Sequence, residues 1–267
     1  TVKGLEALQR ADVVIYDHLV SPRLLDHCMP EATIIYAGKE QGEHAKSQHQ
    51  INQLLIRYAK AGKTVVRLKG GDPVLFGRGG EEALACRASG VPVEFVPGVT
   101  SAIAAPIYAG IPVTHRLCAS SVAILTCHED PGKPDTSIRW EQVATATDTL
   151  VILMGVGTLA TIAQRLITHG RTAHTPCAAI EWGTWPQQRT VVGTLSTIAA
   201  RCRQAHLKPP AVIVVGEVVK LRHYLAWFER APLFGKRIVV TRPADKADQL
   251  ADQLEALGAE VVRLPAI

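Results

Sequence analysis

Short runs of apolar, often β-branched residues alternate with helical patterns along the first part of the chain. Each run is apolar on both faces, which is typical of parallel strands covered by helices. The runs that predict strands are residues 12–17, 32–38, 64–72 and 93–98. Helices are predicted over residues 47–61, 80–89 and 101–109. The first of these helices has a candidate N-cap in Ser47 and a stop in Gly62.

The same alternation restarts after residues 111–116. Further strands are predicted over residues 121–127, 149–155, 176–184, 190–195 and 210–219. Helices are predicted over residues 158–169 and 194–206, and the spacing around residues 182–193 is that of a hairpin. The final segment has a strand, an amphipathic helix and a second strand, which predicts one βαβ unit.

These patterns predict two α/β domains, each with a parallel or mixed sheet and flanking helices, followed by a fragment. The expected regions are residues 1–116, 117–231 and 232–267. The chain opens within a helical pattern and stops just after a strand pattern. We therefore expect both ends to be cuts in a longer protein.

Composition narrows the classes of function. The 267 residues are 47% hydrophobic and 20% charged, with a formal net charge of +5, an ordinary globular balance. Aromatic residues make up only 5%, which argues against a nucleic-acid partner bound by base stacking. The apolar runs are too short to span a membrane. The six cysteines form no CxxC pair and no secretory signal is present, so we expect reduced thiols, a cytoplasmic location and no metal site.

The segment with the most chemical information is LKGGDPVLFGRGGEE, residues 68–82. Glycines at the carboxyl end of a strand allow backbone to approach a ligand closely. The spacing is not GxGxxG, which disfavours a dinucleotide site. A tight strand-to-helix turn is the alternative interpretation.

The string GGDPVLFGRGGEE resembles the cofactor loop of the uroporphyrinogen-III C-methyltransferases, a branch of the tetrapyrrole methylase superfamily. Other strings resemble the same family in the same order: ADVVIYDHLVSPRLL, YAGK, VPGVTSAIAAPIYAGIPVTHR, VILMG, AAIEWGT and PAVIVVGEVV. The resemblance extends from Thr1 to about residue 230. The tail, with GKRIVVTRP and AEVVRLPAI, resembles the opening of uroporphyrinogen-III synthase.

The resemblance implies the two-domain tetrapyrrole methylase fold, with the cofactor in the interdomain cleft. It implies an enzyme that uses S-adenosyl-L-methionine and leaves S-adenosyl-L-homocysteine. The implied substrate is uroporphyrinogen III, methylated at C2 and C7 to give precorrin-1 and then precorrin-2, in sirohaem and cobalamin biosynthesis. It also implies a homodimer, and a parent protein with synthase activity.

The resemblance also implies the site residues. The positions that match cofactor-binding residues are Gly70, Gly71, Asp72, Leu75, Thr100, Ser101, Met154, Gly183 and Ala211. Asp17 matches the proton acceptor and Lys39 the proton donor. General acid–base chemistry supports Asp17, because a carboxylate at a strand end can take the proton that a methylated pyrrole must lose from a bridging carbon. The alternatives are an N-cap role for Asp17 and a solvated side chain for Lys39.

One feature of the family is absent. The family begins with a strand and a loop of the GxGPGD kind, whereas Thr1 already lies in the helix that follows. The absence leaves open a non-catalytic module that binds cofactor or tetrapyrrole. A later corrin-ring methyltransferase is the other alternative, although the FGRGGEE and VTHR strings favour the first-step enzyme.

Overall fold

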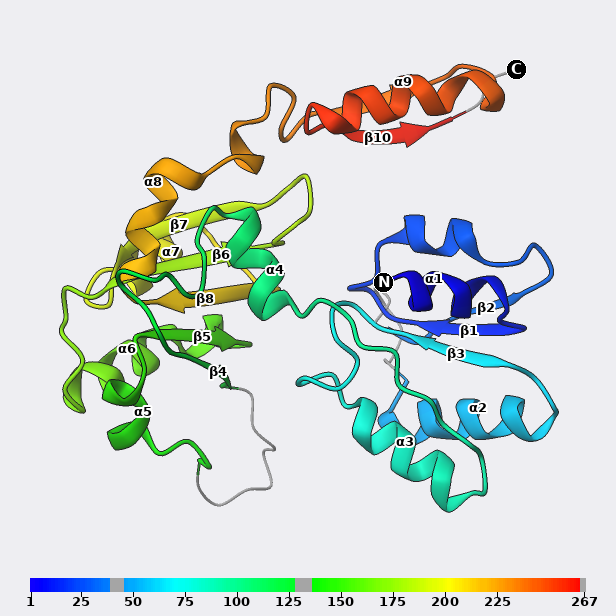
Figure 1. Ribbon diagram of the computed structural model, residues 1–267, viewed down its shortest axis with the longest axis horizontal. Helices are drawn as coiled ribbons and strands as arrows, with labels where there is room; N and C mark the ends of the chain where they lie inside the picture. The colour runs from blue at the N-terminus through cyan, green and yellow to red at the C-terminus, as the bar shows by residue number, and fades with distance from the viewer. Residues whose placement is uncertain (39–45, 128–135, 265–267) are drawn as a thin grey trace. The chain divides into compact units, whose positions relative to one another are not determined.

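The computed structural model describes residues 1–38, 46–127 and 136–264 (Figure 1). Contacts divide the chain into two compact units, Thr1–Thr100 and Ser101–Ile267. The predicted boundary at residue 116 therefore differs from the observed one. Helix α4 (Ser101–Tyr108) buries Ala102 and Ala105 in a core cluster with strands of the second unit, so residues 101–116 group with that unit.

The first unit contains a parallel sheet in the order β2-β1-β3. Its strands are β1 (Val13–Tyr16), β2 (Thr33–Tyr36) and β3 (Val65–Leu68). Its helices are α1 (Val2–Gln9), α2 (Gln48–Lys60), α3 (Gly79–Ala88) and the 3-10 helix η1 (Pro22–His27). In Figure 1, α2 and α3 lie on one face of this sheet and α1 on the other.

The alternation of side chains along β1 explains this layering. Val13 and Ile15 pack in one cluster with Ile51 and Leu55 of α2. Val14 points to the other face and packs with Leu8 of α1 and other residues. Both faces of the strand are therefore buried, as its continuous apolar pattern predicted.

The predicted start of α2 is confirmed in detail. The Ser47 hydroxyl accepts a hydrogen bond from the backbone N–H of Gln50 at 3.2 Å, and the Gln50 side chain accepts one from the Ser47 N–H at 2.7 Å. This reciprocal pair is a capping box, which satisfies two N–H groups that a helix start leaves open.

The predicted strand at residues 93–98 is wrong. These residues pair with no strand, although their backbone is described throughout. Pro92 and Pro97 have no N–H to donate to a ladder. The Gly98 N–H donates instead to the side chain of Asp72 at 3.1 Å. A side-chain partner and two prolines therefore outweigh the apolar pattern.

The second unit contains a mixed sheet in the order β4-β5-β8-β6-β7. The strands are β4 (Val122–Thr126), β5 (Thr149–Leu153), β6 (Pro176–Glu181), β7 (Arg189–Thr194) and β8 (Ala211–Val215). Strand β8 runs antiparallel to both β5 and β6, and β6–β7 is the predicted hairpin. The helices are α4, α5 (Trp140–Ala146), α6 (Leu159–Thr168), α7 (Ile198–Gln204) and α8 (Arg222–Leu225), together with the 3-10 helices η2 (Val156–Thr158), η3 (Glu217–Leu221) and η4 (Phe228–Arg230).

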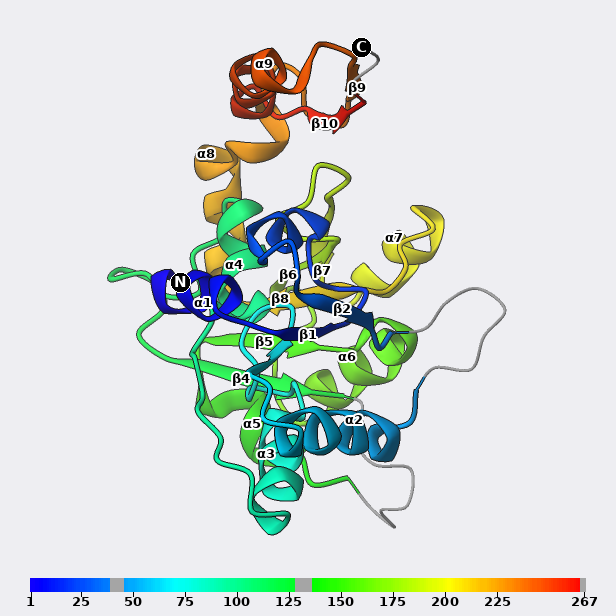
Figure 2. The same ribbon diagram turned by 90° about the vertical axis from the view of Figure 1, so that its right-hand side faces the viewer.

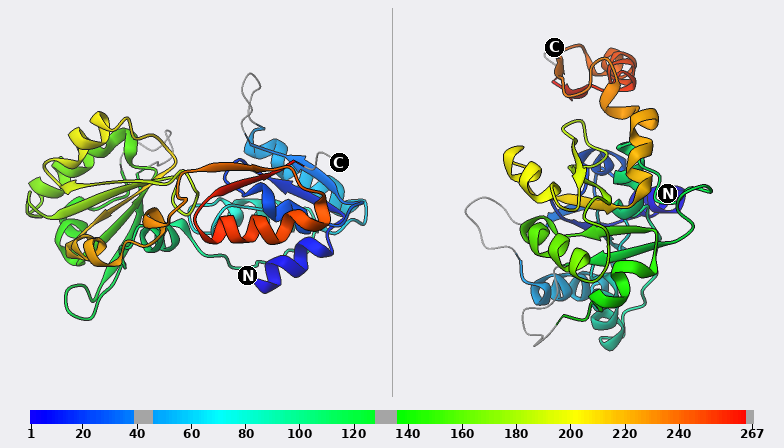
Figure 3. Two further views of the ribbon diagram at one scale, coloured as in Figure 1. Left: turned by 90° about the horizontal axis from the view of Figure 1, so that it is seen from above. Right: turned by 90° about the vertical axis from the view of Figure 1, so that its left-hand side faces the viewer.

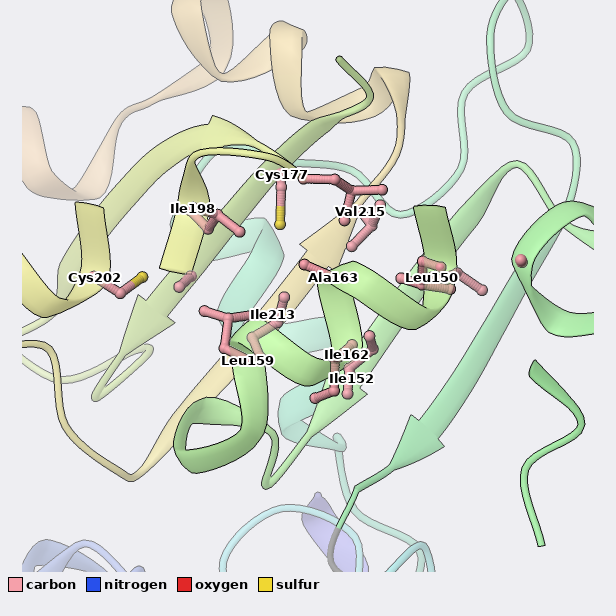
Figure 4. Packing of buried hydrophobic residues seen from close by; sticks show 14 of the residues in the cluster. Leu150, Ile152, Leu159, Ile162, Ala163, Cys177, Ile198, Cys202, Ile213 and Val215 are labelled. Carbon is pink, nitrogen blue, oxygen red and sulfur yellow. The ribbon is translucent and has the colours of Figure 1, made fainter. Parts of the chain in front are cut away.

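The larger core of this unit lies between the sheet and helices α6 and α7 (Figure 4). Leu150, Ile152 and Ile213 face Ile162 of α6 and Ile198 of α7 there. The alternate sheet residues, such as Val151 and Val214, face α4. The sheet is thus covered on both faces.

The tail forms the predicted βαβ unit, with β9 (Arg237–Val240), α9 (Ala244–Ala256) and β10 (Glu260–Arg263). The two strands are parallel, and α9 lies along them (Figures 2 and 3). Contacts group this segment with the second unit rather than setting it apart. Its origin in a synthase domain stays a prediction.

Candidate functional site

The predicted site residues of the first unit gather where parallel strands end. Asp17 follows β1 directly, and Gly70, Gly71 and Asp72 follow β3, the strand paired with β1. Carboxyl ends of parallel strands share one edge of a sheet, which is where open α/β sheets bind ligands. Lys39 lies outside the described residues.

Asp17 is held at both carboxylate oxygens. Its Oδ1 accepts a hydrogen bond from the Leu19 N–H at 3.1 Å, and its Oδ2 lies 3.3 Å from Nη2 of Arg67. The side chain keeps 21% exposure. The following 3-10 helix η1 has Ser21 at its N-cap position, so Asp17 does not cap it. The carboxylate is therefore oriented and still reachable, as a proton acceptor must be.

Arg67, which contacts Asp17, also lies among other charged side chains. The Arg67 Nε donates to Glu82 Oε1 at 3.2 Å, and Lys69 Nζ lies 3.6 Å from the same oxygen. Burial lowers the pKa of Lys69 from its ordinary value, and the positive charge of Arg67 lowers it further. The carboxylates of Glu82 and Asp17 act in the opposite direction.

Sequence reasoning assigned no role to Arg67 or Glu82. A signal existed for Arg67, because it is the one charged residue within the apolar strand β3. A charge in a strand covered on both faces needs a partner. The partner of Arg67 was not predictable, since Glu82 belongs to a helix beyond the glycine-rich loop.

The loop after β3 is organised by Asp72. Its Oδ1 accepts from the N–H groups of Val74 and Leu75, both at 2.9 Å, and its Oδ2 accepts from Gly98. The hydrogen bond from Leu75, with those from Gly98 and Val74, holds the pKa of Asp72 below its usual range. Backbone donors of its own loop thus occupy the carboxylate, so we assign Asp72 to shaping the loop.

Glycines are required at two points of this loop. Gly71 has a φ of +77°, in the left-handed region that favours glycine. A Cβ on Gly70 would lie 2.8 Å from the carbonyl oxygen of Leu19. This close packing ties the loop to the segment that carries Asp17. The tight-turn alternative thus accounts for these glycines, and their contact with a ligand stays a prediction.

The loop leaves apolar side chains in solvent. Leu75, a predicted cofactor contact, is 36% exposed, and its neighbours Val74 and Phe76 are 48% and 40% exposed. Farther along the chain, Thr100 is half-buried at the end of the first unit, and Ser101 is exposed at the start of α4 in the second.

The predicted residues of the second unit gather at one end of its mixed sheet. Met154 follows β5 and Gly183 lies just beyond β6, while Ala211 begins β8 between them. The register pairs Glu181 with Ala211, and Leu153 with Val212. Because β8 runs opposite to its neighbours, its start meets their ends, and the three residues share this edge.

Backbone strain is concentrated at the same edge. Met154 has a φ of +55°, Trp182 of +47° and Thr184 of +75°. Such values cost about 1–3 kcal/mol each for residues other than glycine, and they cluster at functional sites. A Cβ on Gly183 would lie 2.3 Å from Cβ of Ala105 in α4. Gly183 is therefore required for packing, whatever else it contacts.

A buried polar network holds the loop that follows β6. The side chain of Gln188, 2% exposed, accepts from the Thr184 N–H at 2.8 Å and donates to Glu229 at 2.7 Å. Glu229 also forms an ion pair with Arg222 at 2.6 Å. Each of these polar groups has a partner, so the strained turn at residues 182–184 is supported from one side.

Within residues 1–38, 46–127 and 136–264, no group of three or more His, Cys, Asp or Glu side chains is arranged to hold a metal ion. In the same ranges, no helix is long and apolar enough to cross a membrane.

The chain is similar in sequence to known proteins of one family. A family model described as tetrapyrrole (corrin/porphyrin) methylases matches residues 1–199. The uroporphyrinogen-III C-methyltransferase of Bacillus subtilis (strain 168) is 46% identical over 265 residues, which cover 99% of this chain and 55% of that protein. The enzyme of the same name from Priestia megaterium is 51% identical over 219 residues, which cover 82% of this chain and 92% of that protein.

A solved structure shows the same fold. The uroporphyrin-III C-methyl transferase from Thermus thermophilus, in complex with S-adenyl homocysteine, matches with a TM-score of 0.69 and 39% identity, over 83% of this chain and 92% of that chain. The chain spans about half the length of longer curated relatives, such as the Bacillus protein at 55%.

Proposed function

The chain belongs to the tetrapyrrole methylase family, and from this premise we propose that it transfers methyl groups from S-adenosylmethionine to uroporphyrinogen III. The observation that carries the proposal is the match of 51% identity along 92% of the Priestia enzyme, which bears that name. The placement of Asp17 at the edge of the first sheet supports it, because this reaction needs a proton acceptor.

The finer reaction follows from the resemblance in sequence. We propose methylation at C2 and then at C7, with precorrin-1 as the intermediate and precorrin-2 as the product. Sirohaem and cobalamin biosynthesis both need such a product. A homodimer, a cytoplasmic location and a synthase activity of the parent protein stay predictions.

The described residues fit an S-adenosyl cofactor. Gly70 and Gly71 expose backbone at one sheet edge, and Leu75 adds an apolar side chain. In the second unit, Met154 is 49% exposed beside the small residues Gly183 and Ala211. Small residues and open apolar side chains with a few backbone polar groups are the usual lining of cofactor sites. Each unit thus offers residues that would bind the cofactor, with Thr100 among those of the first unit and Ser101 among those of the second.

The chain's own contribution to chemistry is proton transfer and orientation. The cofactor, when bound, supplies a methyl group on a positively charged sulfur. After a pyrrole carbon is methylated, the ring carries positive charge until a neighbouring bridging carbon loses a proton. We assign this proton to the Oδ2 of Asp17, whose Oδ1 is anchored by the Leu19 N–H. Lys39, the predicted proton donor, lies outside the described residues.

Two other functions are separated from this one by experiment. The protein is incubated with uroporphyrinogen III and S-adenosylmethionine that carries a labelled methyl group, and the products are resolved by mass spectrometry. We expect products with one and then two added methyl groups. Transfer only to later, already methylated corrin precursors would indicate a later corrin-ring methyltransferase. Cofactor binding without transfer to any of these substrates would indicate a binding module.

A further inference from the structure

Glu82 is a buried carboxylate that the proposed proton transfer does not use directly. It lies in the first turn of α3 and is 4% exposed. Burying an ionised carboxylate is costly unless cationic or hydrogen-bonding partners surround it. The contacts of such a residue therefore show what it stabilises.

The partners of Glu82 converge on one oxygen. Its Oε1 accepts a hydrogen bond from Gln48 Nε2 at 3.1 Å and from Arg67 Nε at 3.2 Å, and Lys69 Nζ lies 3.6 Å away. Gln48 belongs to α2, Arg67 belongs to β3, and Lys69 directly follows β3. The carboxylate therefore ties a helix to the strand that enters the glycine-rich loop.

Arg67 connects Glu82 to Asp17. Its Nε is bonded to Glu82, and its Nη2 lies 3.3 Å from Oδ2 of Asp17. Its Nη1 donates to the carbonyl oxygens of Leu68 at 2.9 Å and Ile15 at 3.3 Å. Each of the three guanidinium nitrogens therefore has a hydrogen-bond partner, and these contacts fix the orientation of the planar group.

We propose that Glu82 is a positioning residue for the proton acceptor Asp17 and acts through the guanidinium of Arg67. This inference rests on the proposed function, because it assigns a role within that reaction. Without the negative charge of Glu82, the hydrogen bond to Arg67 Nε becomes weaker and the guanidinium is held less tightly. The Oδ2 of Asp17 then loses the contact that directs it, while Oδ1 stays bonded to the Leu19 N–H.

The test is Glu82→Gln, which keeps an oxygen acceptor for Gln48 and removes the charge. We expect kcat to fall roughly 10- to 100-fold, as displaced catalytic groups commonly cause. The KM for uroporphyrinogen III and the Kd for S-adenosylmethionine should change less than about twofold, since both oxygens of Asp72 and the cofactor loop are untouched. Glu82→Asp, which restores the charge on a shorter side chain, should recover part of kcat.

A second readout separates positioning from plain stability. With uroporphyrinogen III deuterated at its bridging carbons, the isotope effect on kcat should be larger for Glu82→Gln than for the parent, because proton removal becomes slower. A structural defect alone would lower the active fraction and leave the isotope effect unchanged. The matched control is Glu94→Gln, which removes an exposed carboxylate paired with Lys3 in the same unit and should leave both values unchanged.

High-resolution crystal structures of the parent and both Glu82 variants complete the test. We expect Arg67 to leave Asp17 in Glu82→Gln and to keep the contact in Glu82→Asp. If Arg67 stays in place in Glu82→Gln, or if kcat is unchanged, the inference is overturned.

If the parent does not methylate uroporphyrinogen III, the proposed function fails, and the position of Arg67 alone decides the role of Glu82. If Glu82→Gln does not fold, the isotope effect in Glu82→Asp decides, because the shorter side chain should restore only part of kcat. An isotope effect and a kcat both equal to the parent's overturn the inference.

Discussion

The two sheet edges that carry the predicted site residues are built in different ways. In the first unit, charged side chains form a chain of contacts from Glu82 through Arg67 to Asp17. In the second unit, the residues are small or apolar, and the backbone has positive φ values at Met154 and Trp182. Ionic contacts between side chains thus characterise the first edge, and small residues with an unusual backbone conformation characterise the second.

We therefore propose a different role for each edge. Proton transfer needs a group of defined charge and orientation, which the first edge supplies. Holding a cofactor against protein needs close backbone approach and open apolar surface, which small residues provide. Substitutions in the contacts from Glu82 to Asp17 should therefore change the rate of reaction, whereas substitutions of the small residues at the second edge should change cofactor affinity and stability.

The largest expected effect is that of Asp17→Asn. The amide can still accept from the Leu19 N–H but cannot take a proton, so kcat should fall by about 10²–10⁴-fold. Calorimetry should show cofactor affinity close to the parent value. The matched control is Asp12→Asn, at the other end of β1, where the side chain accepts from the Thr64 N–H. Equal turnover in Asp17→Asn and the parent would remove Asp17 from the reaction.

Next in size is Gly183→Ala at the second edge. The added Cβ would meet Ala105, so we expect a loss of about 1–3 kcal/mol in the free energy of unfolding, typical of overpacking, together with weaker cofactor binding. Urea unfolding and calorimetry measure the two effects. Gly157→Ala is the control, because a Cβ there has no neighbour within 4 Å among the described residues. A Gly183→Ala protein with the parent's stability would contradict this prediction and show that α4 can shift to accommodate the added Cβ.

The smallest effect is expected for Asp72→Asn and depends on pH. The folded-state pKa of Asp72 is lowered, first by the hydrogen bond from Leu75, so its carboxylate stabilises the fold above the ordinary aspartate pKa of about 3.9. That contribution is lost as the pH falls through the lowered folded value. Asp72→Asn should lower the free energy of unfolding at pH 7 by at most about 1 kcal/mol, because solvent screens this partly exposed group.

Unfolding in urea across the acid range checks the sign of this effect. The difference between the parent and Asp72→Asn should shrink as the pH falls below about 4 and the carboxylate is protonated. A difference that stays constant with pH would mean that the hydrogen bonds, rather than the charge, stabilise the loop.

Local pattern determined the elements of this protein. Strands β1 and β3, the capping box at Ser47 and the turn at the Gly71 loop follow from neighbouring residues. Regular hydrogen bonding and side-chain periodicity act over a few residues, so these features can be predicted from short segments. The βαβ tail was predicted in the same way.

Tertiary structure alone decided the features that depend on distant partners. Residues 93–98 form no strand because the Gly98 N–H bonds to Asp72, which adds to the effect of Pro92 and Pro97. The first unit ends at Thr100, and not at residue 116 as predicted, because α4 packs on the second sheet. The contact of Arg67 with Asp17 joins residues 50 positions apart. Such contacts exist only once strand register and helix packing bring the partners together, and no local pattern encodes that distance.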